Sequence, residues 1–243
     1  MSGALVFLSD AHLGAQPPDV EAPREARLHQ FFTHLHGTGR ELIIVGDLFD
    51  FWFEYRTAIP RRHFPTLVAL RKLIQAGMPV TMLNGNHDFW LGHFLEDSVG
   101  VRTVYGALPI EAQGRRLWVH HGDGLIGGDG GYKLLKRVLR SRTNIRLYQW
   151  LHPDLGLPLA LRVSGWSRRA RQHDVPSDRL WAEVATPRFA EGYDAVILGH
   201  FHEAIERREH GKEMFVLGDW ISQFTYLELE GGTLTLKTWD GGR

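Results

Sequence analysis

Short runs of apolar and β-branched residues alternate along this chain with longer segments in which apolar residues recur at helical spacing. That alternation is typical of an α/β fold, because buried strands need short continuous apolar runs whereas helices need one apolar stripe. The short runs predict strands at Ala4–Leu8, Glu41–Val45, Val80–Leu83, Val101–Val104, Arg116–Val119 and Ala195–Leu198. The longer segments predict helices at Arg24–Leu35, Arg62–Gln75 and Ser177–Glu191. Past residue 202 the pattern predicts two hairpins, which pair Ala204–Arg208 with Met214–Leu217 and Phe224–Leu229 with Thr233–Trp239.

Five of the predicted strands run directly into clusters of polar residues. The clusters are Ser9-Asp10-Ala11-His12, Gly46-Asp47-Leu48-Phe49-Asp50, Asn84-Gly85-Asn86-His87-Asp88, His120-His121-Gly122-Asp123 and Gly199-His200-Phe201-His202. Ligand sites in open α/β sheets collect just beyond the carboxyl ends of the strands. The five clusters therefore predict one shared site.

The side chains in these clusters indicate a metal centre. Asp10 and His12 are two residues apart, so both side chains can leave a strand end on the same side and meet one ion. Imidazole, carboxylate and amide oxygen together suit manganese, iron, zinc or nickel better than calcium or magnesium. The candidate ligands are Asp10, His12, Asp47, Asn86, His121, His200 and His202.

The charges of these ligands fit two divalent ions better than one. Two carboxylates, Asp10 and Asp47, leave two positive charges to hold a phosphate dianion and to lower the pKa of a bound water. A hydroxide between ions roughly 3.5–4 Å apart would then attack phosphorus in line. Taken singly, each cluster is more often a turn, a cap or a surface histidine than a set of metal ligands, so the prediction depends on all five occurring together.

Composition and net charge exclude several classes of protein and of functional site. The chain has 243 residues, of which 43% are hydrophobic and 23% charged, which excludes chain-wide disorder and suits one domain over residues 1–243. No cysteine is present, which excludes disulfides, thiolate zinc sites and a cysteine nucleophile. A formal net charge of zero gives no argument for nucleic acid binding. Neither a secretory signal nor a membrane-spanning apolar stretch is evident, so we expect a cytoplasmic protein.

In this order the five clusters resemble the motifs of the calcineurin-like metallophosphoesterase superfamily. The resemblance implies a four-layer α/β-β/α sandwich of two mixed β-sheets with helices outside. It implies a first ion bound by Asp10, His12, Asp47 and His202. It also implies a second ion, to which Asp47 forms a bridge and which is completed by Asn86, His121 and His200.

His87 and Asp88 complete the Gly-Asn-His-Asp pattern of that superfamily. The resemblance implies that His87 stabilises the phosphate or protonates the leaving group, and that Asp88 orients it. A general acid needs a proton that is available near neutral pH, and a carboxylate partner raises the basicity of imidazole. The alternative is that His87 only supports the site structurally.

Residues from about 125 to 175 are too many for a simple connection, and they predict a helical insertion. Between Lys133 and Arg171 the chain has ten basic residues and one acidic residue, Asp154. Apolar residues recur among them at near-helical spacing, which predicts a basic amphipathic pair of helices. Such a pair can lie on anionic lipid headgroups and shelter acyl chains, although an ordinary solvated cap stays open. No recognised nucleic-acid-binding motif accompanies the basic residues.

Three further segments resemble the UDP-2,3-diacylglucosamine hydrolase family. They are Gly46-Asp47-Leu48-Phe49, Phe89-Trp90-Leu91-Gly92 and His121-Gly122-Asp123-Gly124-Leu125. The resemblance implies manganese-dependent cleavage of the pyrophosphate of a nucleotide-linked diacyl sugar in lipid A synthesis. The products would be UMP and a lipid phosphate, formed at the cytoplasmic face of the inner membrane. It further implies that Asp129 and Tyr132 approach the substrate.

One departure from that family leaves alternatives open. The best-known members have arginine where this chain has His87, so another phosphodiester or pyrophosphate substrate is compatible with the sequence. A soluble phosphodiesterase or phosphatase acting on nucleotides is the main alternative. A non-catalytic scaffold is a lesser one, because every expected ligand is present. The sequence does not predict the oligomeric state.

Overall fold

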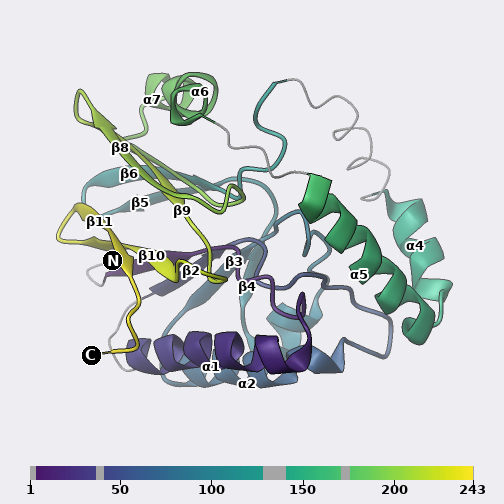
Figure 1. Ribbon diagram of the computed structural model, residues 1–243. Helices are drawn as coiled ribbons and strands as arrows, with labels where there is room; N and C mark the ends of the chain where they lie inside the picture. The colour runs from purple at the N-terminus through teal and green to yellow at the C-terminus, as the bar shows by residue number, and fades with distance from the viewer. Residues whose placement is uncertain (1–3, 37–40, 128–140, 171–175, 243) are drawn as a thin grey trace.

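Two mixed β-sheets packed face to face form the centre of the protein in the computed structural model, which describes residues 4–36, 41–127, 141–170 and 176–242 (Figure 1). The six-stranded sheet has the order β11-β10-β1-β2-β3-β4. Its strands are β1 (Leu5–Leu8), β2 (Glu41–Val45), β3 (Val80–Leu83), β4 (Arg102–Val104), β10 (Thr225–Glu230) and β11 (Thr233–Thr238). The second sheet has the order β5-β6-β7-β9-β8. Its strands are β5 (Leu108–Ala112), β6 (Arg115–His120), β7 (Ala195–Leu198), β8 (Ala204–Glu209) and β9 (Lys212–Leu217).

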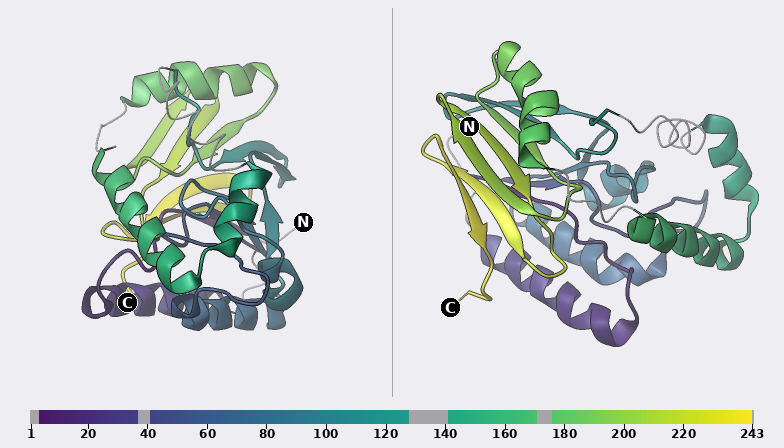
Figure 2. Two further views of the ribbon diagram at one scale, coloured as in Figure 1. Left: turned by 90° about the vertical axis from the view of Figure 1, so that its right-hand side faces the viewer. Right: turned by 45° about the horizontal axis from the view of Figure 1, so that its top comes forward.

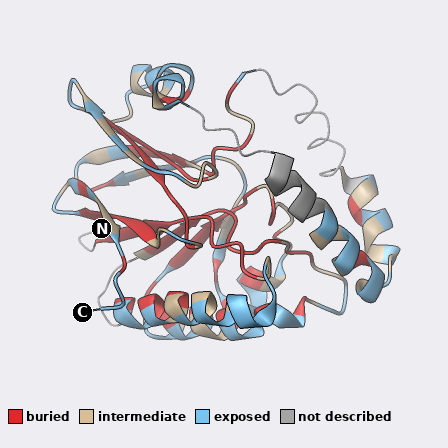
Figure 3. Ribbon diagram, viewed as in Figure 1, coloured by how far each residue is buried: buried red, intermediate tan, exposed pale blue. Residues whose placement is uncertain are grey.

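The central strands are buried on both faces, which explains their continuous apolar runs. In β1, Leu5 and Phe7 belong to the core between the two sheets, whereas Val6 and Leu8 pack beneath the outer helices. Helices α1 (Pro18–Leu35) and α2 (Phe64–Gln75) cover the outer face of the six-stranded sheet (Figures 1 and 3). The predicted sandwich of two mixed sheets with helices outside is thereby confirmed.

The outer face of the second sheet carries a helical segment made of three short pieces. These are α6 (Ser177–Leu180), a π-helical turn, η3 (Trp181–Ala185), and α7 (Thr186–Ala190). The predicted helix Ser177–Glu191 therefore exists, with a change of helical pitch in its middle. A second π-helical turn, η2 (Leu95–Val99), follows the loop after β3.

Two elements differ from the prediction. Helix α1 begins at Pro18, six residues before the predicted start at Arg24. The earlier start leaves no signal in the sequence, because Pro23 lies inside the helix and the residues before it are largely exposed and show no apolar stripe. Strand β5 was not predicted, since Pro109 removes a backbone donor from its five residues. Because β5 lies at the edge of its sheet, that missing donor costs no ladder hydrogen bond with a further strand.

Helices α4 (Arg142–Trp150) and α5 (Pro153–Ala170) lie within the span predicted as a basic insertion. The right-hand view of Figure 2 shows them to one side of the sandwich, joined to each other at one end. The more N-terminal basic residues of that span, from Lys133 to Arg140, lie outside the described residues.

A buried histidine at the start of α2 makes stability depend on pH. His63, in the 3-10 turn η1 (Arg61–His63), is 2% exposed, contacts the Phe51 carbonyl through Nε2 at 3.2 Å and packs against Phe49. Burial lowers the pKa of His63 from 6.5 to about 3. Between these values the unfolded chain binds the proton and the folded protein does not. The free energy of unfolding therefore falls as the pH falls through this window.

We expect His63→Phe to remove this dependence. Between about pH 6 and pH 4, the stability advantage of the parent over the variant should shrink by up to about 1.4 kcal/mol per pH unit. Urea unfolding of both chelator-treated proteins at several pH values measures the difference. Parallel stability curves for parent and variant would show that His63 does not contribute to the acid sensitivity.

Candidate metal centre

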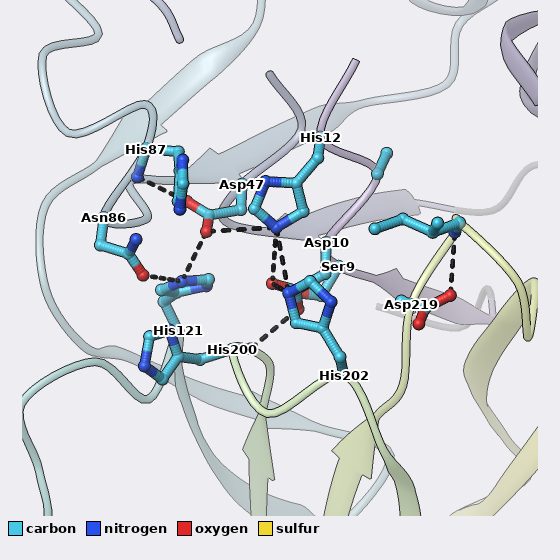
Figure 4. A network of polar contacts seen from close by, with 12 residues as sticks. Ser9, Asp10, His12, Asp47, Asn86, His87, His121, His200, His202 and Asp219 are labelled. Carbon is cyan, nitrogen blue, oxygen red and sulfur yellow. Dashed lines mark hydrogen bonds and ion pairs between the residues drawn. The ribbon is translucent and has the colours of Figure 1, made fainter. Parts of the chain in front are cut away.

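The loops that follow β1, β2, β3, β6 and β7 meet at one place, and Figure 4 shows their polar side chains pointing toward one another. Three groups of possible ligand atoms occur there among the described residues, with all atoms of a group within 4.8 Å of one another. The groups are Asp10, His12 and His202; His12, Asp47 and His87; and Asp47, His121 and His200. The structure thus brings together all the residues that the sequence predicted as ligands, including Asn86, whose Oδ1 is 3.2 Å from Nε2 of His121.

Five of the seven candidate ligands are held in an uncommon backbone conformation. Positive φ angles occur at Asp10 (57°), His12 (45°), Asp47 (51°), His200 (75°) and His202 (54°). Residues with a Cβ rarely adopt the left-handed region, and such residues cluster at functional sites where the surrounding structure enforces them. Each loop turns sharply as it leaves its strand, and the side chain that follows is directed into the common site.

Glycines in the same loops allow the close approach of the ligands. A Cβ on Gly85 would lie 2.0 Å from Oδ1 of Asp47, and one on Gly46 would lie 2.6 Å from Nδ1 of His121. No other residue type fits these two positions without displacing a candidate ligand. Steric crowding therefore explains why glycine precedes the candidate ligand in the Gly-Asp and Gly-Asn motifs.

One oxygen lies between the two halves of the site. Oδ2 of Asp47 is 3.6 Å from Nε2 of His12 in the first group and 3.3 Å from Nε2 of His121 in the second. In the first group, Oδ1 of Asp10 lies 3.6 Å from Nε2 of His12 and 3.4 Å from Nε2 of His202. The arrangement has the form of two ligand sets that share one carboxylate.

The atoms of the first set fit a cation. Oδ1 of Asp10 is buried and has no hydrogen-bond partner among the described residues, while its Oδ2 accepts from Ser9 Oγ and from the His200 amide at 2.8 Å. Nε2 of His12 lies only 3.1 Å from Nε2 of His202. A carboxylate oxygen without a partner facing two converging imidazole nitrogens is the donor set that a transition-metal ion satisfies.

The side chains of the second set are also oriented so that their nitrogen atoms can bind a metal ion. Nδ1 of His121 lies 2.9 Å from the carbonyl of Val45, which assigns the ring proton to Nδ1 and leaves Nε2 for coordination. His200 approaches from the loop after β7, with its ring 5.2 Å from that of His121. His202 keeps a side-chain exposure of 34%, so the site is open to solvent on that side.

Buried opposite charges dominate the electrostatics. Burial would raise the pKa of Asp47, but the imidazoles of His121 and His87 hold it well below its usual range. Burial opposes the charge of His121, but Asp47 and Asp10 raise its pKa to about 10. Burial and the charge of His121 lower the pKa of His200 to about 3. Metal binding to His121 must therefore displace a proton that this site holds firmly.

His87 lies beside the ligands and contacts Asp50. Its Nδ1 is 3.1 Å from the carbonyl of Asp50 and 3.4 Å from the Asp50 carboxylate, which is also 3.4 Å from Nδ1 of His12. Asp88 instead accepts from the backbone amides of Asp47, Gly85 and Phe49 at 3.1, 2.8 and 3.3 Å. Asp88 thus fixes the turns that carry the ligands, and Asp50 is the carboxylate in contact with His87.

A loop that sequence reasoning missed supports two of the ligands. The amide of Trp220, in the loop between β9 and β10, donates to the Asp10 carbonyl at 3.1 Å. The side-chain amide of Gln223 donates to the carbonyl of His202 and accepts from the amide of Ala204 at 3.0 Å. These contacts brace Asp10 and His202, both of which have positive φ angles. The sequence carries no spacing signal for them.

Other residues of these loops, and the two predicted substrate contacts, need only a brief description. His120 stacks on Trp118 and its Nδ1 accepts from the Gly122 amide at 2.8 Å, so it stabilises a turn. Trp52 and Phe53 are buried. Asp129 and Tyr132, the predicted substrate contacts, lie outside the described residues. Among the helices that the structure does describe, none is long and apolar enough to cross a membrane.

Comparisons with known proteins identify the family of this chain. Residues 4–204 match the family described as calcineurin-like phosphoesterase. A UDP-2,3-diacylglucosamine hydrolase of Porphyromonas gingivalis is 28% identical, with 98% of this chain and 98% of the relative covered. One of Ralstonia nicotianae is 31% identical, with 98% and 93% covered. A solved phosphoesterase structure from E. coli, Yfce, is 16% identical with a TM-score of 0.49, over 99% of this chain and 95% of that one. The chain belongs to the calcineurin-like phosphoesterase family.

Proposed function

We propose that this metal-dependent phosphoester hydrolase cleaves the pyrophosphate of a nucleotide-linked diacyl sugar, giving a nucleoside monophosphate and a lipid phosphate. The observation that carries the dimetal chemistry is the position of Asp47 Oδ2 between the two histidine groups. The substrate class is supported by relatives named UDP-2,3-diacylglucosamine hydrolase that align over nearly the whole chain.

The candidate ligands would hold two divalent ions. Asp10, His12, Asp47 and His202 form the first set, and Asp47, Asn86, His121 and His200 the second. We propose manganese, with iron, zinc and nickel as alternatives that suit the same donors. Such ions, when bound, neutralise phosphoryl oxygens and lower the pKa of water. The protein's own contribution is to fix the donors with strained loops and to leave the side at His202 open to the substrate.

His87 is proposed to act on the phosphate rather than on the metals. Burial lowers the pKa of His87 to about 4, so its imidazole is neutral near pH 7. With Nδ1–H directed to Asp50, Nε2 carries no proton and can accept one. The negative charge of a bound phosphate would raise this pKa again, after which His87 could stabilise that charge or protonate the leaving group.

Replacing His87 by alanine tests this role. We expect kcat to fall by about 10²–10⁴-fold, the range for loss of a general acid, while the metal content changes little. Steady-state kinetics and metal analysis of the same preparations give both numbers. Loss of metal in proportion to activity would assign His87 to the ligand set instead.

The insertion helices favour contact with an anionic membrane surface. Leu147, Trp150, Leu155 and Leu159 are between 52% and 86% exposed. An ordinary solvated cap would bury large apolar side chains, whereas a helix that lies on a bilayer exposes them beside basic residues. The ten basic residues between Lys133 and Arg171 supply the matching charge. We propose that the protein binds peripherally at the cytoplasmic face through α4 and α5.

Product analysis tests the proposed reaction. Purified protein with manganese should convert UDP-2,3-diacylglucosamine to UMP and a lipid phosphate, which mass spectrometry and phosphorus NMR identify. Release of inorganic phosphate would reject the cleavage position. Detergent or anionic vesicles should raise the rate if the lipid is the natural substrate.

A soluble nucleotide phosphodiesterase is the second candidate, and the presence of His87 in place of arginine favours it. That enzyme would hydrolyse a chromogenic diester and nucleotides efficiently, with no gain from vesicles. Activity confined to water-soluble diesters would select this function over the lipid one.

A further inference from the structure

An aromatic contact joins the insertion to the loop after β2, which carries Asp47. The ring of Tyr148, on α4, lies 4.5 Å from Phe53 at 66°, 6.0 Å from Phe51 and 6.2 Å from Tyr55, measured between ring centroids. Edge-to-face pairs at such separations are attractive beyond the apolar area that they bury. Phe53 is itself buried and packs against Trp90, so Tyr148 contacts a wall that belongs to the main body of the protein.

Helix α5 contacts the same group of aromatic side chains. A Cβ on Gly156 would lie 2.5 Å from the hydroxyl of Tyr55 and 3.1 Å from that of Tyr148. The two phenols therefore lie directly against the backbone of α5, and burial raises the pKa of each hydroxyl. Three segments, α4, α5 and the Phe51–Tyr55 stretch, are in contact at one small cluster. We call Phe51, Phe53, Tyr55, Tyr148 and Gly156 the aromatic latch.

The latch is connected to the reacting centre through adjacent residues. Phe51 follows Asp50, whose carboxylate lies 3.4 Å from both His12 and His87. The Phe51 carbonyl is in turn held by His63 at 3.2 Å. The segment on which Tyr148 rests is thus fixed at its start by residues of the metal centre and by the base of α2.

Helix α4 presents two different faces. Ile145 is buried and Tyr148 makes the latch contacts, whereas Leu147 and Trp150 are exposed on the other side. Within the described part of the insertion, the latch contacts are aromatic and leave the outward apolar side chains free to meet an amphiphile.

We propose that the aromatic latch, through Tyr148, holds α4 and α5 at a fixed distance from the metal centre and so determines selection for bulky amphiphilic phosphoesters. The latch is a positioning device and takes no part in the chemistry. Small diesters, which reach the metal centre through the open side at His202, do not depend on it. This proposal rests on the proposed function for the identity of the bulky substrate.

Variants at Tyr148 test the latch with two independent readouts. Tyr148→Ala removes the ring contacts, Tyr148→Phe keeps them, and Thr143→Ala, an exposed position on the same helix, is the matched control. For UDP-2,3-diacylglucosamine, we expect Tyr148→Ala to raise KM about tenfold, which corresponds to about 1.4 kcal/mol. Its kcat/KM for bis(4-nitrophenyl) phosphate and its metal content should match the parent. The Phe variant and the control should resemble the parent on both substrates.

Hydrogen exchange supplies the second readout, which needs no substrate. Residues 142–162 should exchange faster in Tyr148→Ala than in the parent and in Tyr148→Phe, with unchanged protection in β1 and β2. Unchanged exchange in the insertion would overturn the latch. Equal losses on the large and small substrates would overturn its role in selection. If the parent itself fails to cleave the diacyl sugar nucleotide, the proposed function fails, and the exchange data still decide whether the latch exists.

Discussion

Replacing Asp47 by alanine is expected to reduce turnover by about 10³-fold or more, because the reaction loses the charge stabilisation that a paired metal site supplies. Oδ2 of Asp47 is the oxygen between the two histidine groups, and Oδ1 accepts the His87 amide at 2.9 Å. The change therefore removes a ligand from both sets and also releases the loop that carries His87. Kinetics with a saturating metal and direct metal titration measure the two losses.

The Asp47→Ala protein should remain folded, because His121 can lose its proton once the carboxylate that raises its pKa is gone, so no unpaired charge stays buried. Asp194→Asn is the matched control. Asp194 lies at the start of β7, at the opposite end of that strand from His200, and pairs with Lys212. The Asp194→Asn substitution should lower the free energy of unfolding somewhat and leave kcat unchanged. Parental turnover in Asp47→Ala would show that the reaction takes place elsewhere on the protein.

Gly85→Ala is the second change with a large expected effect, although glycine offers no chemical group. The new methyl group would lie 2.0 Å from Oδ1 and 2.6 Å from the backbone nitrogen of Asp47. Because one of these atoms belongs to the backbone, rotation of the side chain cannot relieve the overlap, and the loop must move. We expect metal affinity to fall about 10–100-fold, as when residues that orient a ligand are lost, and activity to fall with it. Isothermal titration with manganese gives the affinity.

Gly127→Ala serves as the control for Gly85→Ala. Among the described residues its Cβ would meet only Oε2 of Glu183, at 3.5 Å, which is an ordinary contact distance. Metal affinity and unfolding midpoint should both stay at the parental values. If Gly85→Ala also bound manganese like the parent, the close packing of the β2 and β3 loops would have no functional meaning.

Residue pattern alone was enough to predict most of the strands and helices, whereas the two-sheet sandwich was implied by the resemblance to a family. The continuous runs of β1, β2, β3 and β7 follow from burial on both faces, and polar clusters after parallel strands lie at the carboxyl ends of their sheet, here of two sheets that face each other. Local pattern failed at β5, where Pro109 is compatible with a strand only because that strand is an edge. It also failed at the start of α1, where exposed residues leave no periodicity to detect.

The identity of the candidate ligands, and the order in which the strands supply them, could be predicted from the amino-acid sequence because both depend on residue type and local spacing. Tertiary structure alone decided which atoms face one another: the position of Asp47 Oδ2 between two histidines, the contact of His87 with Asp50, and the bracing of His202 by Gln223. Asp50 and His87 are 37 residues apart, and His202 and Gln223 are separated by two strands. No periodicity encodes such contacts, because they arise only when packing of the two sheets brings distant loops together.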